Sequence, residues 1–166
     1  MPRNIQGYIL PYAKSLARSY FNVGSNIYNS FNHAEKEMNE NRLSELIVGY
    51  VNSAFSCEIT LKYFIFIHHS VEDLGTLSHN LKDLFIILPN DFRQQIQNLT
   101  VLYVNQRLSN QPPYSESNFN EDLDLCSNAF VEARYWFEVG APGSKGKQAS
   151  NLFMYSFSRA LCERLD

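Results

Sequence analysis

Apolar residues recur every three or four positions along most of this chain, which is the period of an amphipathic α-helix. The longest apolar-rich stretch without proline covers residues 41–69. Its hydrophobic stripe consists of Ile47, Tyr50, Ala54, Leu61 and Ile65. We expect this segment to be the central helix of the fold.

The same period predicts further helices on both sides of the central one, separated by polar or proline-containing segments. Asn90 or Asp91 is expected to cap the helix that follows Pro89. Two prolines and many small polar residues predict an exposed loop over residues 109–120. The expected helices cover residues 11 to about 40, 81–88, 92–108, 121–139 and 148–165.

The connection between the first helix and the central helix is short and polar, which predicts an antiparallel pair. Together these segments predict an all-α fold, an up-and-down helical bundle of about five helices. A chain of 166 residues suits one domain with a proper core, so we expect residues 1–166 to form a single domain.

The composition adds limits on function. An apolar share of 45% and an aromatic share of 14% supply enough material for a packed core and argue against general disorder. The net charge of -3 argues against a nucleic-acid partner held mainly by a large basic surface, but it leaves room for a local basic site.

Three cysteines, Cys57, Cys126 and Cys162, lie far apart in the sequence and form no CxxC pair. They therefore suggest neither a zinc site nor a disulfide framework, and a reduced, cytoplasmic setting fits best. No stretch approaches the roughly 18 uninterrupted apolar residues of a membrane span. We expect no membrane insertion and no secretion.

Two predicted helices place a charged residue within a stripe that otherwise consists of core residues. Glu58 is followed four residues later by Lys62, and Arg134 by Glu138. If the two helices lie antiparallel, Glu58 meets Arg134, while Lys62 faces Glu138 or solvent. Buried charges are costly unless they are paired. The cluster is therefore either a structural ion-pair network or a ligand site, in which Arg134 suits a phosphate or carboxylate.

His79 precedes the short helix at residues 81–88, so it either caps that helix or joins the polar cluster through a hydrogen bond. No HExxH motif or equivalent set of ligands occurs in the sequence. We therefore expect no metal ion and no cofactor.

Three segments in order along the chain resemble the HEPN superfamily, which consists of small helical-bundle proteins often linked to nucleotide or RNA chemistry. The segment at 54–66 places an acidic residue and a following Leu-Lys among apolar residues. The segment at 77–85 resembles the "HDLxxL" start of the next helix, and the segment at 130–138 resembles a late helix with Arg-Tyr and a nearby glutamate. The resemblance implies an up-and-down bundle that is commonly dimeric.

Ribonuclease members of the superfamily carry an arginine and, four to six residues later, a histidine. Here Arg134 is not followed by any histidine, because His79 is the last one in the chain. Cleavage of RNA without a metal needs a proton-transfer group, and the usual group is missing.

The first hypothesis is thus a non-catalytic HEPN-like homodimer that binds a nucleotide, an RNA or a protein partner. Two alternatives stay open: a ribonuclease or nucleotide-transferring toxin component with a non-standard site, and a structural or regulatory dimerisation module. The predicted polar cluster consists of Glu58, Lys62, His79, Arg134 and Glu138.

Overall fold

The computed structural model describes residues 6–32, 40–69, 77–108, 111–129 and 147–165. Within these ranges the chain forms six helices and no strand, which confirms the predicted all-α fold class. The helices are α1 (Gln6–Asn32), α2 (Glu40–His69), α3 (Leu81–Ile87), α4 (Asn90–Asn105), α5 (Glu116–Leu125) and α7 (Lys147–Cys162).

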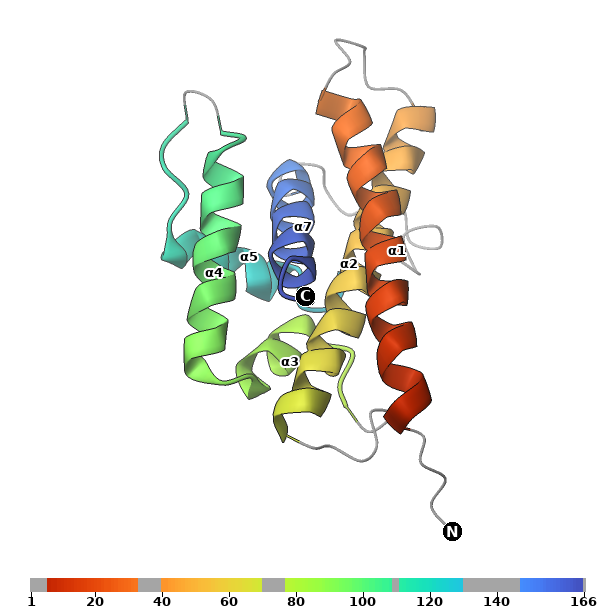
Figure 1. Ribbon diagram of the computed structural model, residues 1–166. Helices are drawn as coiled ribbons and strands as arrows, with labels where there is room; N and C mark the ends of the chain where they lie inside the picture. Colours follow the sequence, from red (N-terminus) through yellow and green to blue (C-terminus); the bar gives the residue numbers. More distant parts are fainter. Residues whose placement is uncertain (1–5, 33–39, 70–76, 109–110, 130–146, 166) are drawn as a thin grey trace.

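The two longest helices, α1 and α2, lie side by side and run in opposite directions (Figure 1), as the short connection predicted. Gly24 on α1 and Gly49 on α2 lie at the contact between these two helices. A Cβ atom on Gly24 would lie 3.0 Å from the carbonyl oxygen of Gly49, and one on Gly49 would lie 2.9 Å from Ile27 Cγ2. The spacing of α1 and α2 therefore depends on the absence of these two side chains.

The core lies between this pair and α4, and α7 runs through its centre (Figure 1). Four phenylalanines from α3, α5 and α7 pack against one another. The ring centroid of Phe157 lies 5.6 Å from that of Phe85, 5.8 Å from that of Phe119 and 5.4 Å from that of Phe153. Phe119, Phe153 and Phe157 are fully buried, so this aromatic cluster joins three helices that are far apart in sequence.

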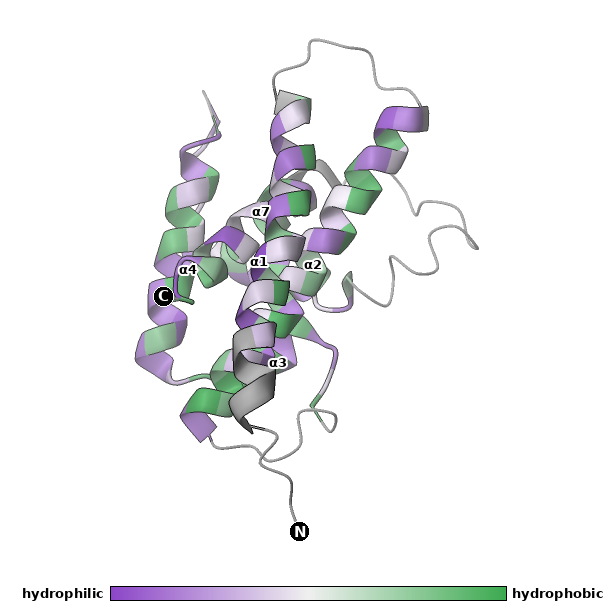
Figure 2. Cartoon of the chain, turned by 45° about the vertical axis from the view of Figure 1, so that its right-hand side comes forward, coloured by the Kyte–Doolittle hydropathy of each residue, from purple (hydrophilic) through white to green (hydrophobic). Residues whose placement is uncertain are grey.

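The outer face of α1 keeps several apolar side chains exposed. Figure 2 shows apolar positions among polar ones along this helix. Tyr12, Leu16 and Val23 share one face at helical spacing, and between 45% and 73% of each residue is exposed. This row is defined here as the α1 apolar row.

The structure corrects three predicted helix starts. The first is that of α1, which begins at Gln6 and not at residue 11. We expected Asn90 or Asp91 to cap α4, but its N-cap is Pro89, which makes no side-chain capping bond. We also expected a loop through residue 120, but α5 begins at Glu116. Ser115 Oγ accepts a hydrogen bond from the Asn118 backbone, and Asn118 Oδ1 accepts one from the Ser115 backbone. This capping box starts the helix inside the predicted loop.

The predicted helix over residues 121–139 is also wrong at residues 126–128, which form a turn. The backbone of Ala129 donates to the carbonyl of Cys126 at 3.0 Å, and the carbonyl of Ser127 accepts from Leu81 at 2.8 Å. The turn thus supplies an acceptor for a backbone N–H at the start of α3, which an uninterrupted helix would use internally. Residues 130–139 lie outside the described residues.

All three cysteines are buried and unpaired by disulfides, as expected from their spacing. Burial raises the pKa of the Cys57 and Cys162 thiols above the usual value. They therefore stay protonated and serve as small core residues. None of the described helices is long and apolar enough to cross a lipid bilayer.

A tyrosine and an aspartate fix the segment before α5. Tyr114 Oη donates to Asp122 Oδ2 at 2.7 Å, and Asn105 pairs through its side-chain amide with both the backbone N–H and the carbonyl of Tyr114. Burial raises the pKa of the Asp122 carboxyl above its ordinary value of 3.8, and the hydrogen bond from Tyr114 lowers it by less. Burial also raises the pKa of the Tyr114 hydroxyl, which therefore stays a neutral donor.

This pKa shift predicts how stability depends on pH. Because the folded state binds the Asp122 proton more tightly, the contribution of this residue to stability is fully present below pH 3.8 and is lost as pH rises through the higher folded value. Asp122→Asn keeps an acceptor for Tyr114 without burying a charge. We expect this substitution to raise the melting temperature at pH 7 by about 1–3 °C. For this chain length, the shift corresponds to a gain in unfolding free energy of about 1 kcal/mol or less. The gain should be smaller at pH 3.

Melting curves of both proteins between pH 3 and pH 8 test this expectation. Asp124→Asn is the control, because its carboxylate is exposed beside Lys82 and should not share the gain at pH 7. A gain for Asp122→Asn that stays the same across this range would contradict the buried-charge explanation.

Candidate functional site

The candidate site is centred on a carboxylate in the apolar stripe of α2. Glu58 lies between Cys57 and Leu61, both fully buried, and only 7% of Glu58 itself is exposed. The helical period that buries Ala54 and Leu61 places Glu58 in the same row. Its burial was expected from the sequence and is confirmed.

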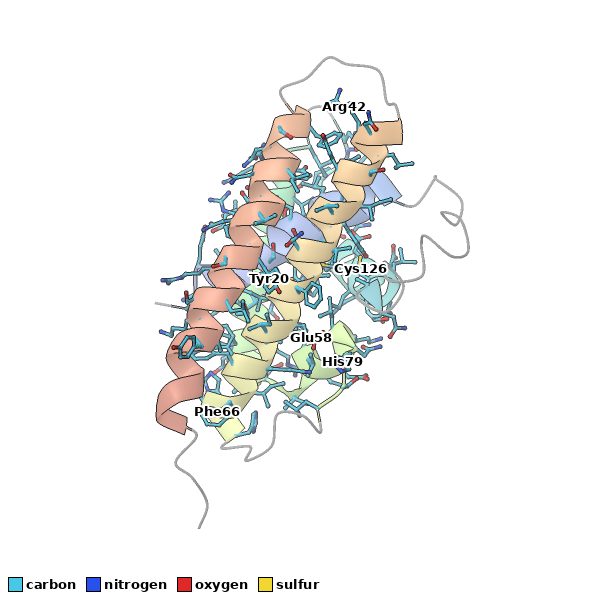
Figure 3. The ribbon with its side chains drawn as sticks, turned by 90° about the vertical axis from the view of Figure 1, so that its right-hand side faces the viewer. Tyr20, Arg42, Glu58, Phe66, His79 and Cys126 are labelled. Atoms are coloured by element: carbon cyan, nitrogen blue, oxygen red, sulfur yellow. The ribbon has the colours of Figure 1, made fainter. Side chains whose placement is uncertain are left out.

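Two basic side chains contact the same carboxylate oxygen. Lys62 Nζ lies 2.9 Å from Glu58 Oε1, one helical turn away, and His79 Nδ1 lies 2.8 Å from that atom. Figure 3 shows Glu58 on α2 with His79 beside it on the segment before α3. A carboxylate oxygen accepts hydrogen bonds, so the tautomer of His79 with its proton on Nδ1 is the one that donates in this contact.

The segment that carries His79 is fixed by a helix cap. Asn80 is the N-cap of α3, and its Oδ1 accepts a hydrogen bond from the Asp83 backbone at 3.0 Å. Ser78 Oγ accepts from the Asn80 backbone at 2.9 Å, and Asn80 Nδ2 donates to Asn128 Oδ1 at 3.2 Å. Asn80 therefore takes the capping role that the sequence also allowed for His79, and His79 joins the cluster.

The other carboxylate oxygen lacks a partner. Among the described residues, Glu58 Oε2 is buried and has no hydrogen bond. A buried polar atom without a partner costs about 1–3 kcal/mol, so most such atoms in folded proteins are paired. The site therefore contains a hydrogen-bond acceptor that a ligand with an N–H or O–H donor could satisfy.

The three side chains differ in their access to solvent. The side chain of His79 is 59% exposed, that of Lys62 is 15% exposed and that of Glu58 is 10% exposed. A molecule that approaches from solvent therefore meets His79 first and the carboxylate last. We define Glu58, Lys62 and His79 as the Glu58 cluster.

Two further predicted members, Arg134 and Glu138, lie outside the described residues. The predicted contact between Glu58 and Arg134 thus stays a prediction. Among the described residues, no three His, Cys, Asp or Glu side chains gather in an arrangement that suits a metal ion.

The sequence predicted only part of the structure that positions His79. A helix start near residue 81 was expected, but the hydrogen bonds of Ser78 and Asn80 were not. Asn80 with Asp83 three residues later was the available signal, because this spacing is typical of a helix start.

The described fold and site define an all-helical bundle with a buried carboxylate held by two basic groups. No protein-family model, curated protein or solved structure matches the chain. The resemblance to the HEPN superfamily therefore stays a prediction.

Proposed function

We propose that this chain is a non-catalytic, HEPN-like binding protein that recognises a nucleotide, free or within an RNA strand, through the Glu58 cluster. The observation that supports this function is the Oε2 atom of Glu58, which is buried and has no hydrogen-bond partner in the part of the chain that the structure describes. Amino and imino groups on nucleobase edges are donors of the kind that a carboxylate oxygen accepts.

The two basic groups favour a ligand that also carries negative charge. Lys62 and His79 lie on one side of the carboxylate, and both contact Oε1. A phosphate beside them would gain charge-assisted hydrogen bonds while a base contacts Oε2. Oε2 is closed to solvent, so a base reaches it only when side chains around Glu58 move.

The proposed working state is a homodimer. The α1 apolar row, Tyr12, Leu16 and Val23, supports this part of the proposal because it offers an apolar surface to a second copy.

Binding can be measured by calorimetric titration of the purified protein with AMP, GMP, CMP, UMP and a short single-stranded RNA. We expect saturable binding of at least one nucleotide. Glu58→Gln should weaken it about tenfold or more, because one charge-assisted hydrogen bond contributes about 1.5–3 kcal/mol. Glu45→Gln is the matched control, since Glu45 is an exposed glutamate on the same helix.

Two results would contradict this function. One is the absence of heat with every nucleotide and with the RNA; the other is equal affinity of Glu58→Gln and wild type.

The contact between His79 and Glu58 also favours a second candidate, in which an oriented histidine transfers a proton during RNA cleavage. The same RNA, incubated with the protein and analysed by gel electrophoresis, separates the candidates. Intact RNA supports the binding protein, whereas cleavage that His79→Ala abolishes supports the enzyme.

A further inference from the structure

A concave surface lies away from the Glu58 cluster, between α3, α4 and α5. Its volume is about 230 Å³. We call it the amide groove, because four of its lining side chains are carboxamides. Its lining consists of Lys82, Phe85, Ile86, Asn90, Arg93, Gln94, Gln97, Asn120, Leu123 and Asp124.

Each of the three helices contributes one face to the groove. On α4 the lining positions are spaced by three, four and seven residues from Asn90, and on α3 and α5 by three and four residues, as expected for single helix faces. Phe85 and Leu123 form an apolar floor and are almost fully buried. All the residues that line the amide groove therefore lie on α3, α4 and α5.

The polar wall on α4 has unused hydrogen-bonding capacity. Arg93 Nη2 donates to Asn90 Oδ1 at 3.2 Å, but Arg93 Nε is buried and has no partner among the described residues. The side-chain amides of Gln97 and Asn120 likewise make no hydrogen bond with other described residues. Gln94 differs, because it donates to Asn98 and to Glu116.

Charge is distributed unevenly along the groove. Lys82 and Asp124 form an ion pair with each other, so neither provides a free charge. Among the described residues, Arg93 has only the neutral Asn90 as its hydrogen-bond partner. It lies in the first turn of α4, whose N-cap Pro89 makes no side-chain bond. Although Asp91 lies in the same turn, the guanidinium and the helix N-terminus together favour an anion at this end.

We infer that the amide groove binds a short peptide segment in which a carboxylate lies beside an apolar residue. The carboxylate would contact Arg93, whose planar guanidinium suits this group. A peptide bond carries one donor and one acceptor, which matches the free carboxamides of Gln97 and Asn120. The apolar side chain of the peptide would pack on the floor formed by Phe85 and Leu123. A base fits less well, because only 5% of Phe85 is exposed, which leaves too little of its ring open for stacking.

Three blocked dipeptides distinguish the possible sources of the carboxylate. Acetyl-Ala-Leu with a free terminal carboxylate represents a chain end, and acetyl-Leu-Asp amide represents an acidic side chain. Acetyl-Ala-Leu amide is the neutral probe. Titration into ¹⁵N-labelled protein, followed by NMR, reports directly on the side-chain amides of Gln97 and Asn120 and on Arg93 Nε–H.

We expect at least one carboxylate probe to shift these three signals, and the neutral probe to leave them in place. Arg93→Gln should weaken the binding about tenfold or more, the loss expected for one charge-assisted hydrogen bond. Gln95→Ala is the control on α4, because Gln95 is exposed and lies outside the groove.

The inference would be overturned by equal shifts with the neutral probe, by unchanged affinity of Arg93→Gln, or by no shift with any peptide. AMP that shifts the Gln97 and Asn120 signals more than the peptides do would instead assign the groove to a nucleotide. None of these outcomes depends on the Glu58 cluster, so the two sites are tested separately.

Discussion

Gly24→Val will destabilise the protein by about 1–3 kcal/mol, the usual cost of forcing extra atoms into a packed interior. Even the first added atom, a Cβ, would lie 2.5 Å from Ser53 Oγ, 3.0 Å from Gly49 O and 3.2 Å from Ser53 N. The serine hydroxyl can rotate, but the other two atoms belong to the backbone of α2. Valine can therefore be accommodated only if α1 and α2 move apart.

Helix propensity acts in the opposite direction, since glycine is about 1 kcal/mol less favourable than alanine within a helix. The loss for Gly24→Val is a net value after this gain. Urea unfolding followed by circular dichroism measures it. Asn26→Val, at an exposed position of the same helix, should change stability by less than about 0.5 kcal/mol. If both variants show the same small change, the close approach of α1 and α2 is not tightly packed.

The role of Gly24 shows where sequence reasoning stops. In a sequence, a single glycine inside a predicted helix indicates only a lower helix propensity, which weakens the helix without breaking it. The contact of Gly24 with Gly49 depends on how far one helix is shifted along the other, and apolar spacing within one helix does not contain that information. The period did predict α1 and α2 and placed Glu58 in a buried row.

For the candidate site, too, the sequence predicted contacts within one helix but not contacts between separate segments. The Lys62 contact follows from a four-residue spacing on one helix, so the sequence alone indicates it. The His79 contact joins residues 21 positions apart and depends on the Asn80 cap and on the turn at 126–128. A continuous helix was predicted over that turn, so the anchor of the His79 segment was missed.

The amide groove was not predicted, although its α4 wall has helical spacing. A polar row on a helix normally faces solvent, and nothing in the sequence showed that Asn90, Arg93 and Gln97 face other helices. The wall is completed by α5, whose first turn lay inside a predicted loop. A site formed by three helices requires their packing, whereas a pair within one helix does not.

The Glu58 cluster raises the question of why a bundle keeps a carboxylate in its core. Replacing a buried ion pair with apolar residues of similar volume is often neutral or stabilising, so burial of such a pair is weak evidence for a role in stability. A structural ion-pair network should lose stability when either partner is removed. In a binding site, removal of the carboxylate should leave the stability of the fold nearly unchanged. Removal of its basic partner should lower that stability, because the carboxylate then stays buried without it.

Two single substitutions distinguish these explanations. Lys62→Met leaves Glu58 buried, with His79 as its remaining partner among the described residues, and we expect a loss of about 1.5–3 kcal/mol. Glu58→Met removes the buried charge, including the unpaired Oε2, while the long Lys62 side chain can extend to solvent. We expect Glu58→Met to be within about 0.5 kcal/mol of wild type or more stable, and to lose nucleotide binding.

Urea unfolding of both variants measures this asymmetry, with Lys82→Met and Asp124→Met as the control pair, because both of these side chains are about half exposed. Removing the cation beside the exposed Asp124 should cost little, about 0–1 kcal/mol for a surface ion pair. Equal losses for Lys62→Met and Glu58→Met would identify the cluster as a structural ion pair. A stable Glu58→Met protein that no longer binds nucleotides would mean that the carboxylate is kept for its ligand, at a cost to the stability of the helical core.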